Sequence, residues 1–310
     1  MWAERKNTLR ALWPIRCAAT LAVGLSLATA ARADSAASYT VFAAGDIAHC
    51  EWTPARYSGA EATARVVEAG LAASPASAVL LLGDNVYQHG TAAEFQRCYD
   101  PTWGRFKART FPSPGNREYV TPGARDYFAY FGAVAANGYY SLKLGAWRVF
   151  SLDSNLNGEA EAAQMAWLKR ELAASGERCT LAYWHHPLYS SGGHGSLPKM
   201  KAVWELLYQA GAEVVLAGHD HHYERFAPQD ANGNLDRTRG LRQFIVGTGG
   251  SYRTPLFLRS HPNTELRENS RTGVLKLVLR DGAYDWEFLE ASYDGFPNGS
   301  DPDKGSGSCH

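Results

Sequence analysis

The sequence predicts an α/β protein built from two mixed β-sheets that pack together with helices outside. Short apolar runs such as Val79–Leu82 are typical of buried strands, and they alternate with helical patterns along the chain. The first two strands flank one helix, which implies parallel pairing through a right-handed crossover. The last apolar runs, Val274–Leu279 and Trp286–Leu289, predict an antiparallel end.

The first 33 residues have the pattern of a signal peptide and are left out of the fold prediction. Met1–Arg16 is basic, and the apolar run Cys17–Ala31 leads to small residues at Ala31-Arg32-Ala33. We therefore expect an exported protein, periplasmic or extracellular, that begins near Asp34 and keeps no stable membrane anchor. An uncleaved anchor is the alternative. No later stretch approaches the roughly 20 apolar residues of a membrane span.

The remaining chain has the size and charge of one large soluble domain. Residues 34–291 are expected to form this domain, and residues 292–310, rich in Gly, Asp, Ser and Pro, to be a loop-like tail. Removing residues 1–33 takes five basic residues and one acidic residue from totals of 31 each, so the mature chain is mildly acidic. Without a basic stripe, nothing supports binding to nucleic acid or a membrane surface.

Four cysteines remain after processing, namely Cys50, Cys98, Cys179 and Cys309. An even number in an exported chain favours disulfides over free thiols or a thiolate metal site. Four cysteines allow three pairings. Because Cys50 and Cys98 each follow a strand-end motif, Cys50–Cys98 with Cys179–Cys309 is the preferred pairing.

The first elements are a strand, a capped helix and a second strand. Tyr39–Ala44 is the first predicted strand, and Val79–Leu82 is the second. Between them, Ser58 and Glu61 have the spacing of a capping box, in which both side chains bond backbone N–H groups at a helix start. The buried face expected for this helix is Ala64, Val67 and Leu71.

The middle of the chain predicts another capped helix, a turn and a hairpin. Thr91 and Glu94 repeat the capping-box spacing before a short helix. The prolines and glycine of 111–116 mark a strand end and a turn. Tyr139–Leu144 and Arg148–Leu152 predict a hairpin, because a Gly-Ala pair separates them.

Two more helices are expected between the later strands. One covers about 159–174, and the next begins at Pro198 and stops at Gly211. The strands Cys179–Trp184 and Val214–Ala217 are both followed closely by histidines. The buried positions expected in the 159–174 helix are Ala162, Met165, Ala166, Leu168 and Leu172.

Residue types that bind metals follow most of these strands. The carboxyl ends of strands are where open α/β sheets place their ligands. Alone, an aspartate after a strand is more often a helix cap, and a histidine is more often a core residue. Their repetition along the chain predicts a shared metal site instead. The residues are Asp46, Asp84, Asn116, His185, His219 and His221.

Five short blocks, which span about residues 40–250, together resemble the calcineurin-like metallophosphoesterases. The tyrosine three residues after the second aspartate is similar to the purple acid phosphatase branch, in its small tartrate-resistant or bacterial form. The resemblance implies a four-layer αββα sandwich and a catalytic domain over 34–291. The blocks are Gly45-Asp46, Gly83-Asp84-x-x-Tyr87, Gly115-Asn116, His185-x-Pro187 and Gly218-His219-x-His221.

The resemblance also implies a centre of two metal ions bridged by Asp84. Ferric iron would occupy the first site, and iron, zinc or manganese the second. The first metal's ligands would be Asp46, Asp84, Tyr87 and His221. The second metal's ligands would be Asp84, Asn116, His185 and His219.

The chemistry near Tyr87 agrees with iron in the first site. Many relatives use Asp-x-His in the first block, but this chain has Ala48 at the histidine position. Tyr87 can replace the missing ligand. Because free tyrosine has a pKa of about 10, a strongly charged metal is needed to hold it as phenolate near neutral pH. A core aromatic at a strand end is the plainer interpretation of Tyr87.

The resemblance implies a phosphatase that acts on small phosphomonoesters by in-line attack of a metal-bound hydroxide. His194, in a glycine-rich loop, matches a family histidine that contacts substrate and suits proton donation to the leaving group. An ordinary exposed loop histidine is the other interpretation.

Arg117 stands where the family has histidine. It can clamp a phosphate oxygen but cannot donate a proton. Activated aryl phosphates should therefore turn over better than esters with poor leaving groups.

Two other functions remain open from the sequence. One is a phosphodiesterase on the same scaffold, because Arg117 could favour a different phosphate geometry. The other is a protein that binds metal or phosphate but turns over weakly because of Arg117.

Among the remaining histidines, His186 is expected to support the site or to pack in the core, and His222 is expected to point away from the site. Asp153 and Asn155 are expected to support the site or shape a turn.

Overall fold

Two mixed β-sheets form the framework of the computed structural model, which describes residues 38–310 except 52, 136 and 293–302. The first sheet has the order β13 (Lys304–Ser308), β12 (Ala283–Glu290), β11 (Gly273–Arg280), β1 (Tyr39–Ala44), β2 (Ser77–Leu82) and β3 (Thr110–Ser113). The second has the order β10 (Thr264–Glu268), β8 (Tyr223–Phe226), β9 (Arg242–Val246), β7 (Val214–Ala217), β6 (Cys179–Tyr183), β5 (Trp147–Ser151) and β4 (Tyr140–Leu144). The prediction of two mixed sheets is confirmed.

Each sheet combines parallel and antiparallel strands. β1, β2 and β3 run parallel, as do β5, β6, β7 and β9. β11, β12 and β13 continue the first sheet as antiparallel strands. The predicted parallel unit of β1, a helix and β2 is therefore present, and so is the β4–β5 hairpin.

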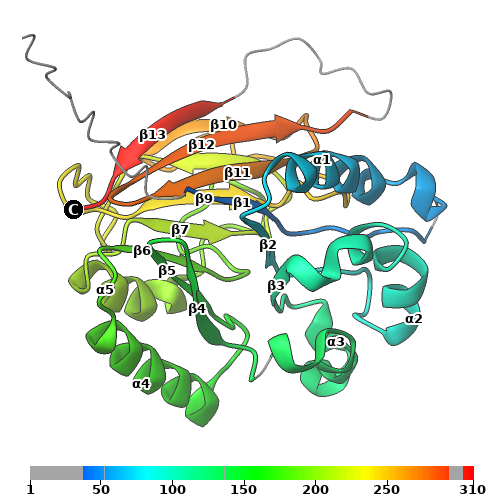
Figure 1. The fold of residues 1–310 in the computed structure, drawn as a ribbon, viewed down its shortest axis with the longest axis horizontal. Coiled ribbons are helices and arrows are strands. Elements are labelled where there is room, and N and C mark those ends of the chain that lie inside the picture. Colours follow the sequence, from blue (N-terminus) through cyan, green and yellow to red (C-terminus); the bar gives the residue numbers. More distant parts are fainter. Residues whose placement is uncertain (1–37, 52, 136, 293–302) are drawn as a thin grey trace, which may run out of the picture. The chain divides into compact units, whose positions relative to one another are not determined.

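The described residues include five α-helices (Figure 1). They are α1 (Gly59–Ala73), α2 (Ala92–Glu94), α3 (Arg125–Phe131), α4 (Gly158–Ala174) and α5 (Lys201–Gln209). A π-helical turn covers Phe95–Tyr99, and 3₁₀ segments cover Ala55–Tyr57, Trp103–Arg109, Glu118–Val120, Pro122–Ala124, Gly132–Val134 and Pro198–Met200. α1 packs on the first sheet, and α4 and α5 pack on the second, which gives the expected four layers.

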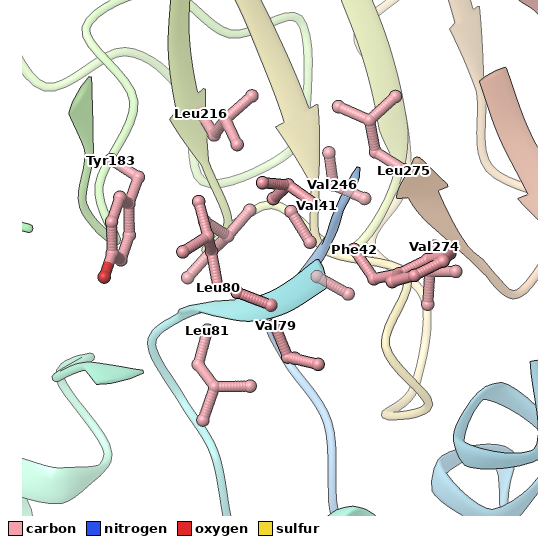
Figure 2. Packing of buried hydrophobic residues seen from close by; sticks show 14 of the residues in the cluster. Val41, Phe42, Val79, Leu80, Leu81, Tyr183, Leu216, Val246, Val274 and Leu275 are labelled. Atoms are coloured by element: carbon pink, nitrogen blue, oxygen red, sulfur yellow. The ribbon is translucent and has the colours of Figure 1, made fainter. Parts of the chain in front are cut away.

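The main core lies between the sheets. Val41 of β1 and Leu80 of β2 share one buried cluster with Leu216 of β7 and Val246 of β9 (Figure 2). The near-continuous apolar sequence of β2 is explained by this position, since all six of its residues are buried. Removing apolar surface from water stabilises the fold by roughly 25 cal/mol per Å², so burial holds these strands in place. The site residues extend from the ends of the strands.

The two capping predictions have different outcomes. Thr91 and Glu94 form a complete capping box at α2. At α1, the Ser58 hydroxyl accepts from the Glu61 N–H at 3.2 Å, but the Glu61 carboxylate bonds arginines instead of closing the box. The second half of that prediction is wrong because Arg65 and Arg105 compete for the carboxylate. Ala64, Val67 and Leu71 are buried in α1 as predicted.

The buried face predicted for α4 is partly wrong. Leu168 is buried, but Ala162 and Ala166 are exposed, and the other buried residue is Gln164. The Gln164 amide accepts from the Asp153 N–H at 2.8 Å and donates to its carbonyl at 3.1 Å. These two bonds tie α4 to the chain after β5 through a polar side chain, which an apolar pattern does not reveal.

The tail was predicted as loop, and this is wrong for Lys304–Ser308. These residues form β13, which pairs antiparallel with β12. Gly305 and Gly307 allow it, because a Cβ at either position would lie 2.3–2.4 Å from the ring of Trp286 or Tyr284. Cys309 then pairs with Cys179. The folded domain therefore extends beyond residue 291.

Both predicted disulfides, Cys50–Cys98 and Cys179–Cys309, are present. In the described part of the chain, no helix has both the length and the apolar character to cross a membrane. The predicted signal peptide, residues 1–33, lies outside the described residues.

Candidate metal centre

The predicted ligands come together where the ends of five strands meet. Asp46 follows β1, Asp84 and Tyr87 follow β2, and Asn116 follows β3. From the second sheet, His185 follows β6, and His219 and His221 follow β7. The Gly45 N–H donates to the Val246 carbonyl at 2.9 Å, which links the two sheets beside the cluster.

Three of the predicted ligands have strained backbones. Among the described residues, only four that are not glycine have positive φ, and three of these are Asp46 (59°), Asp84 (49°) and His219 (72°). Such conformations cost free energy and persist where the surrounding structure enforces them, often at functional sites. Each aspartate lies directly after a glycine that closely contacts another strand end.

One group of ligand atoms surrounds the Tyr87 hydroxyl. This oxygen lies 2.7 Å from Asp46 Oδ1, 3.1 Å from Asp84 Oδ2 and 3.1 Å from His221 Nε2. His221 Nε2 in turn lies 3.2 Å from Asp46 Oδ1. All four side chains are buried. They are the four ligands expected for the first metal.

A second group surrounds His185. Its Nε2 lies 3.3 Å from Asp84 Oδ1, 3.1 Å from Asn116 Oδ1 and 3.3 Å from His219 Nδ1. Asp84 therefore directs Oδ2 at the first group and Oδ1 at the second. This is the arrangement that a bridging carboxylate requires.

The protonation chemistry of the cluster fits a bound cation. Burial raises the pKa of Tyr87 well above its usual value, and the charges of Asp46 and Asp84 raise it further. Burial would also raise the pKa of Asp46, but the charge and hydrogen bond of His221 lower it below the usual range. For His185, burial lowers the pKa, yet Asp84 raises it to about 9. Buried carboxylates, a phenol and imidazoles that lie this close together are suited to bind a metal ion, because buried charges need a partner of opposite charge.

His186 lies closer to the ligands than the sequence suggested. Two sets of three residues each bring one ligand atom per residue within 4.8 Å of one another. The first set is His185, His186 and His219, and the second is Asp46, Asp84 and His185. His186 Nδ1 is held by the Ser154 hydroxyl at 2.7 Å. Burial and the neighbouring charge of His185 lower the pKa of His186, so its ring stays neutral.

Glu118 is a supporting residue to which the sequence analysis gave no role. Its buried carboxylate accepts from the N–H groups of Asp84 (3.0 Å), Asn85 (2.8 Å) and Gly115 (2.7 Å). Burial and the charge of Asp84 raise its pKa to about 7. Gly115 is required here, because a Cβ would lie 2.2 Å from the Asp84 nitrogen. The position of this glutamate, two residues after Asn116, is the sequence signal that could have indicated its role.

His194 lies beside the second group and is partly exposed. Its Nδ1 donates to the His219 carbonyl at 2.9 Å, and its ring centre lies 4.6 Å from that of His219. The loop that carries it is held by Asp220, a buried carboxylate that sequence reasoning missed. Asp220 accepts from the N–H groups of His194 (2.8 Å) and Gly195 (3.2 Å) and from the Ser190 hydroxyl (2.5 Å).

Arg117 lies beside the first group. Its backbone N–H donates to Asp84 Oδ1 at 2.8 Å, and its guanidinium carbon lies 5.5 Å from the centre of the Tyr87 ring. The Nη2 atom donates to the Tyr252 hydroxyl at 3.4 Å. Nε is buried without a hydrogen-bond partner and lies 3.9 Å from Asp84 Oδ2. The Arg117 side chain thus lies against the first group, although its backbone N–H binds the Asp84 oxygen that faces the second, and His194 lies against His219 of the second group.

The remaining residues have structural roles. His222 Nε2 contacts Glu224 at 3.0 Å, away from the cluster. Asp153 accepts from the Asn155 N–H at 2.8 Å and from the Tyr119 hydroxyl at 2.5 Å. Asn155 Nδ2 also donates to the Pro114 carbonyl at 3.2 Å, so both expected roles are observed: the two residues shape a turn and support the chain on either side of Asn116.

The sequence of this chain matches a known family over the part that carries these residues. Residues 39–223 match the calcineurin-like phosphoesterases. The chain belongs to that family. The purple acid phosphatase 15 of Arabidopsis thaliana is 30% identical over an alignment of length 213 that covers 56% of this chain and 40% of that protein. Tartrate-resistant acid phosphatase type 5 of Oryctolagus cuniculus is 32% identical over an alignment of length 144 that covers 44% of this chain and 41% of that protein.

Solved structures show the same fold. Purple acid phosphatase PPD1 from yellow lupin seeds (Lupinus luteus) has a TM-score of 0.65 at 17% identity, over 88% of this chain and 54% of that one. GAP50, the anchor in the inner membrane complex of Plasmodium, has a TM-score of 0.70 at 12% identity, over 88% and 89%. This chain spans about two fifths of the length of the two curated relatives above.

Proposed function

We propose that this protein is an exported phosphatase with two metal ions, and that it hydrolyses small phosphomonoesters. The observation that carries the proposal is the orientation of Asp84, whose two oxygens face two separate groups of ligand atoms. The names of the two curated relatives above, both acid phosphatases, support the reaction type. The proposed ligands are Asp46, Asp84, Tyr87, Asn116, His185, His219 and His221.

Iron is the proposed metal at the Tyr87 site, and iron, zinc or manganese at the other. Tyr87 lies against two carboxylates that disfavour its ionised form, so only a strongly charged cation would hold it as phenolate. The amide, carboxylate and imidazoles of the second group suit several metals equally. When bound, two such ions orient the phosphoryl group and neutralise the charge that develops on it.

Arg117 and His194 would divide the remaining work between them. Arg117 has an unpartnered N–H at Nε and further donors on the same guanidinium, so it can bind phosphate oxygens through more than one bond. It cannot supply a proton. Because His194 Nδ1 is engaged by the His219 carbonyl, Nε2 is the atom left to donate a proton to the leaving oxygen.

Export is proposed on two grounds, the N-terminal pattern of residues 1–33 and the pairing of all four later cysteines in disulfides. Expression of the full chain in a bacterial host, followed by fractionation, tests it. We expect the protein outside the cytoplasm, with an N-terminus near Asp34. Retention of residues 1–33 in a membrane fraction would contradict cleavage and support an anchor.

The reaction is tested with p-nitrophenyl phosphate and bis-p-nitrophenyl phosphate, which share a leaving group and differ in charge. We expect the monoester to be preferred. On glycerol phosphate, which has a poor alkoxide leaving group, Arg117→His should improve turnover by about tenfold, because histidine can donate a proton. Preference for the diester would favour the phosphodiesterase. If neither the native protein nor the Arg117→His variant hydrolyses either ester, the protein binds metal or phosphate without turnover.

A further inference from the structure

An exposed aromatic ring lies against the candidate metal centre. The Tyr252 ring centre is 4.4 Å from that of His221 and 5.9 Å from that of Tyr87. Both of those residues are buried, whereas 43% of Tyr252 is exposed. A single exposed aromatic ring is ordinary on a protein surface, so the feature to explain is the place of this ring beside the candidate ligands. None of the five sequence blocks contains this residue.

The backbone holds Tyr252 in place. The Tyr252 carbonyl accepts a hydrogen bond from His221 Nδ1. The preceding N–H, that of Ser251, donates to the Asp46 carbonyl at 2.9 Å, and Gly249 N–H donates to the Gly45 carbonyl at 3.0 Å. The segment before the ring is therefore fixed to two candidate ligands and the chain between β1 and α1. The backbone that carries the ring is thus preorganised.

Tyr252 also touches the residue proposed to bind phosphate. Its hydroxyl accepts from Arg117 Nη2 at 3.4 Å. A phosphate held by the free donors of Arg117 would thus lie one residue away from an exposed aromatic ring. The group esterified to that phosphate must extend from the buried ligands toward solvent, and Tyr252 offers apolar surface along that edge of the cluster.

We propose that Tyr252 is a specificity residue that binds the aromatic ring of an aryl or benzyl phosphomonoester by ring contact. The proposal rests on the proposed function for its substrate class. Aromatic pairs favour offset or edge-on contacts, and they add to affinity beyond the area they bury. The contact would act on binding of the ester group, while the metal ligands, Arg117 and His194 act on the phosphoryl group.

Binding of non-hydrolysable ligands tests Tyr252 without relying on turnover. Benzylphosphonate and butylphosphonate carry the same charged group and differ in the aromatic ring. Calorimetry on the metal-loaded protein should show tighter binding of benzylphosphonate. Tyr252→Ala should weaken benzylphosphonate binding by about tenfold and butylphosphonate binding by less than about threefold. Tyr252→Phe should keep the benzyl preference, since the ring remains.

The outcomes separate this inference from the proposed function. Equal loss of both ligands in Tyr252→Ala, or loss of preference in Tyr252→Phe, would overturn the subsite and leave Tyr252 as a support for Arg117. Equal binding of both ligands to the native protein would overturn it as well. Hydrolysis of p-nitrophenyl phosphate by the native protein, measured in parallel, tests the proposed function whatever the variants show. Tyr57→Ala is the matched control, because Tyr57 is 61% exposed and its ring contacts Arg56.

Discussion

Asp84 is the residue on which the two ligand groups depend. Its carboxylate oxygens lie 3.1 Å from the Tyr87 hydroxyl and 3.3 Å from His185 Nε2, and its backbone N–H is fixed by Glu118. The positive φ of Asp84 keeps its side chain between the two groups. This conformation costs free energy, and the packing of the neighbouring strand ends enforces it. A substitution here should affect both metals, whereas one at Asn116 should affect one.

Asp84→Asn should therefore lose both metals, and Asn116→Ala should lose only the second. An amide offers one neutral oxygen where the carboxylate offers two charged ones. Elemental analysis of the purified variants measures this directly. Retention of two metals by Asp84→Asn would show that Asp84 does not bridge. Circular dichroism serves as the check that each variant is folded.

Several residues that shape the site could not be predicted from the sequence. Asp46, Asp84, Asn116 and the histidines were identified because each follows a strand in a recognisable block. Asp220 and Tyr252 act through contacts between segments far apart in the sequence, such as that between Arg117 and Tyr252. Glu118 has a signal in its place two residues after Asn116, but its bond to the Asp84 N–H joins residues 34 apart. No local periodicity or spacing encodes such contacts, so they became visible only in the fold.

At the scale of single elements, the His194 loop depends on a carboxylate from the chain after β7. Asp220 accepts three hydrogen bonds from this loop and is fully buried. Gly192 is needed for this contact, because a Cβ there would lie 2.3 Å from the Asp220 carboxyl carbon. The loop is thus positioned by a residue between two candidate ligands, His219 and His221.

Asp220→Asn should lower kcat by about tenfold or more and change its dependence on pH. An asparagine presents an NH₂ group to one of the loop's N–H donors, which leaves a buried donor unsatisfied and displaces His194. Asp230→Asn is the matched control, because Asp230 accepts from loop N–H groups of Asn232 and Asn234 away from the site. A kcat and pH profile like those of the native protein would contradict the role of Asp220.

The start of β7 gives a prediction for stability against pH. Glu213 is buried and accepts from the Thr180 N–H at 2.6 Å, and burial raises its pKa from 4.5 to about 7. The folded protein holds this proton more tightly than the unfolded chain. Stability from the neutral acid is thus complete below about pH 4.5 and is lost as pH rises through about 7.

Glu213→Gln should remove this loss, because glutamine accepts the same hydrogen bond and stays neutral. Between about pH 5 and 8, the free energy of unfolding of the native protein should fall relative to the variant by about 1–3 kcal/mol. Urea denaturation at several pH values measures the difference. A constant difference across this range would contradict burial of an ionisable Glu213.

Strands were easier to predict than the surfaces that cover them. The apolar runs of β1, β2, β6 and β7 are buried on both faces, so each appears in the sequence as a continuous block. β13 escaped prediction because its Gly, Ser and Lys sequence has low strand propensity. Pairing with β12 and the disulfide from Cys309 form it nonetheless.

At the scale of the whole domain, the candidate centre lies where two sheets meet. The first sheet supplies Asp46, Asp84, Tyr87 and Asn116, and the second supplies His185, His219 and His221. The shared core between β1, β2, β7 and β9 sets the distance between these strand ends. The alternation of strands and helices predicted both sheets, but only packing brings their ends together.

Metal content and the visible spectrum of the purified protein test the two-metal centre most directly. We expect about two metals per chain, including iron, and a purple or pink absorption band from tyrosinate bound to iron. The band should disappear in Tyr87→Phe while the second metal is retained. Two metals without colour would remove Tyr87 from the ligands. No metal after reconstitution with iron and zinc would contradict the metal centre and the catalytic account built on it.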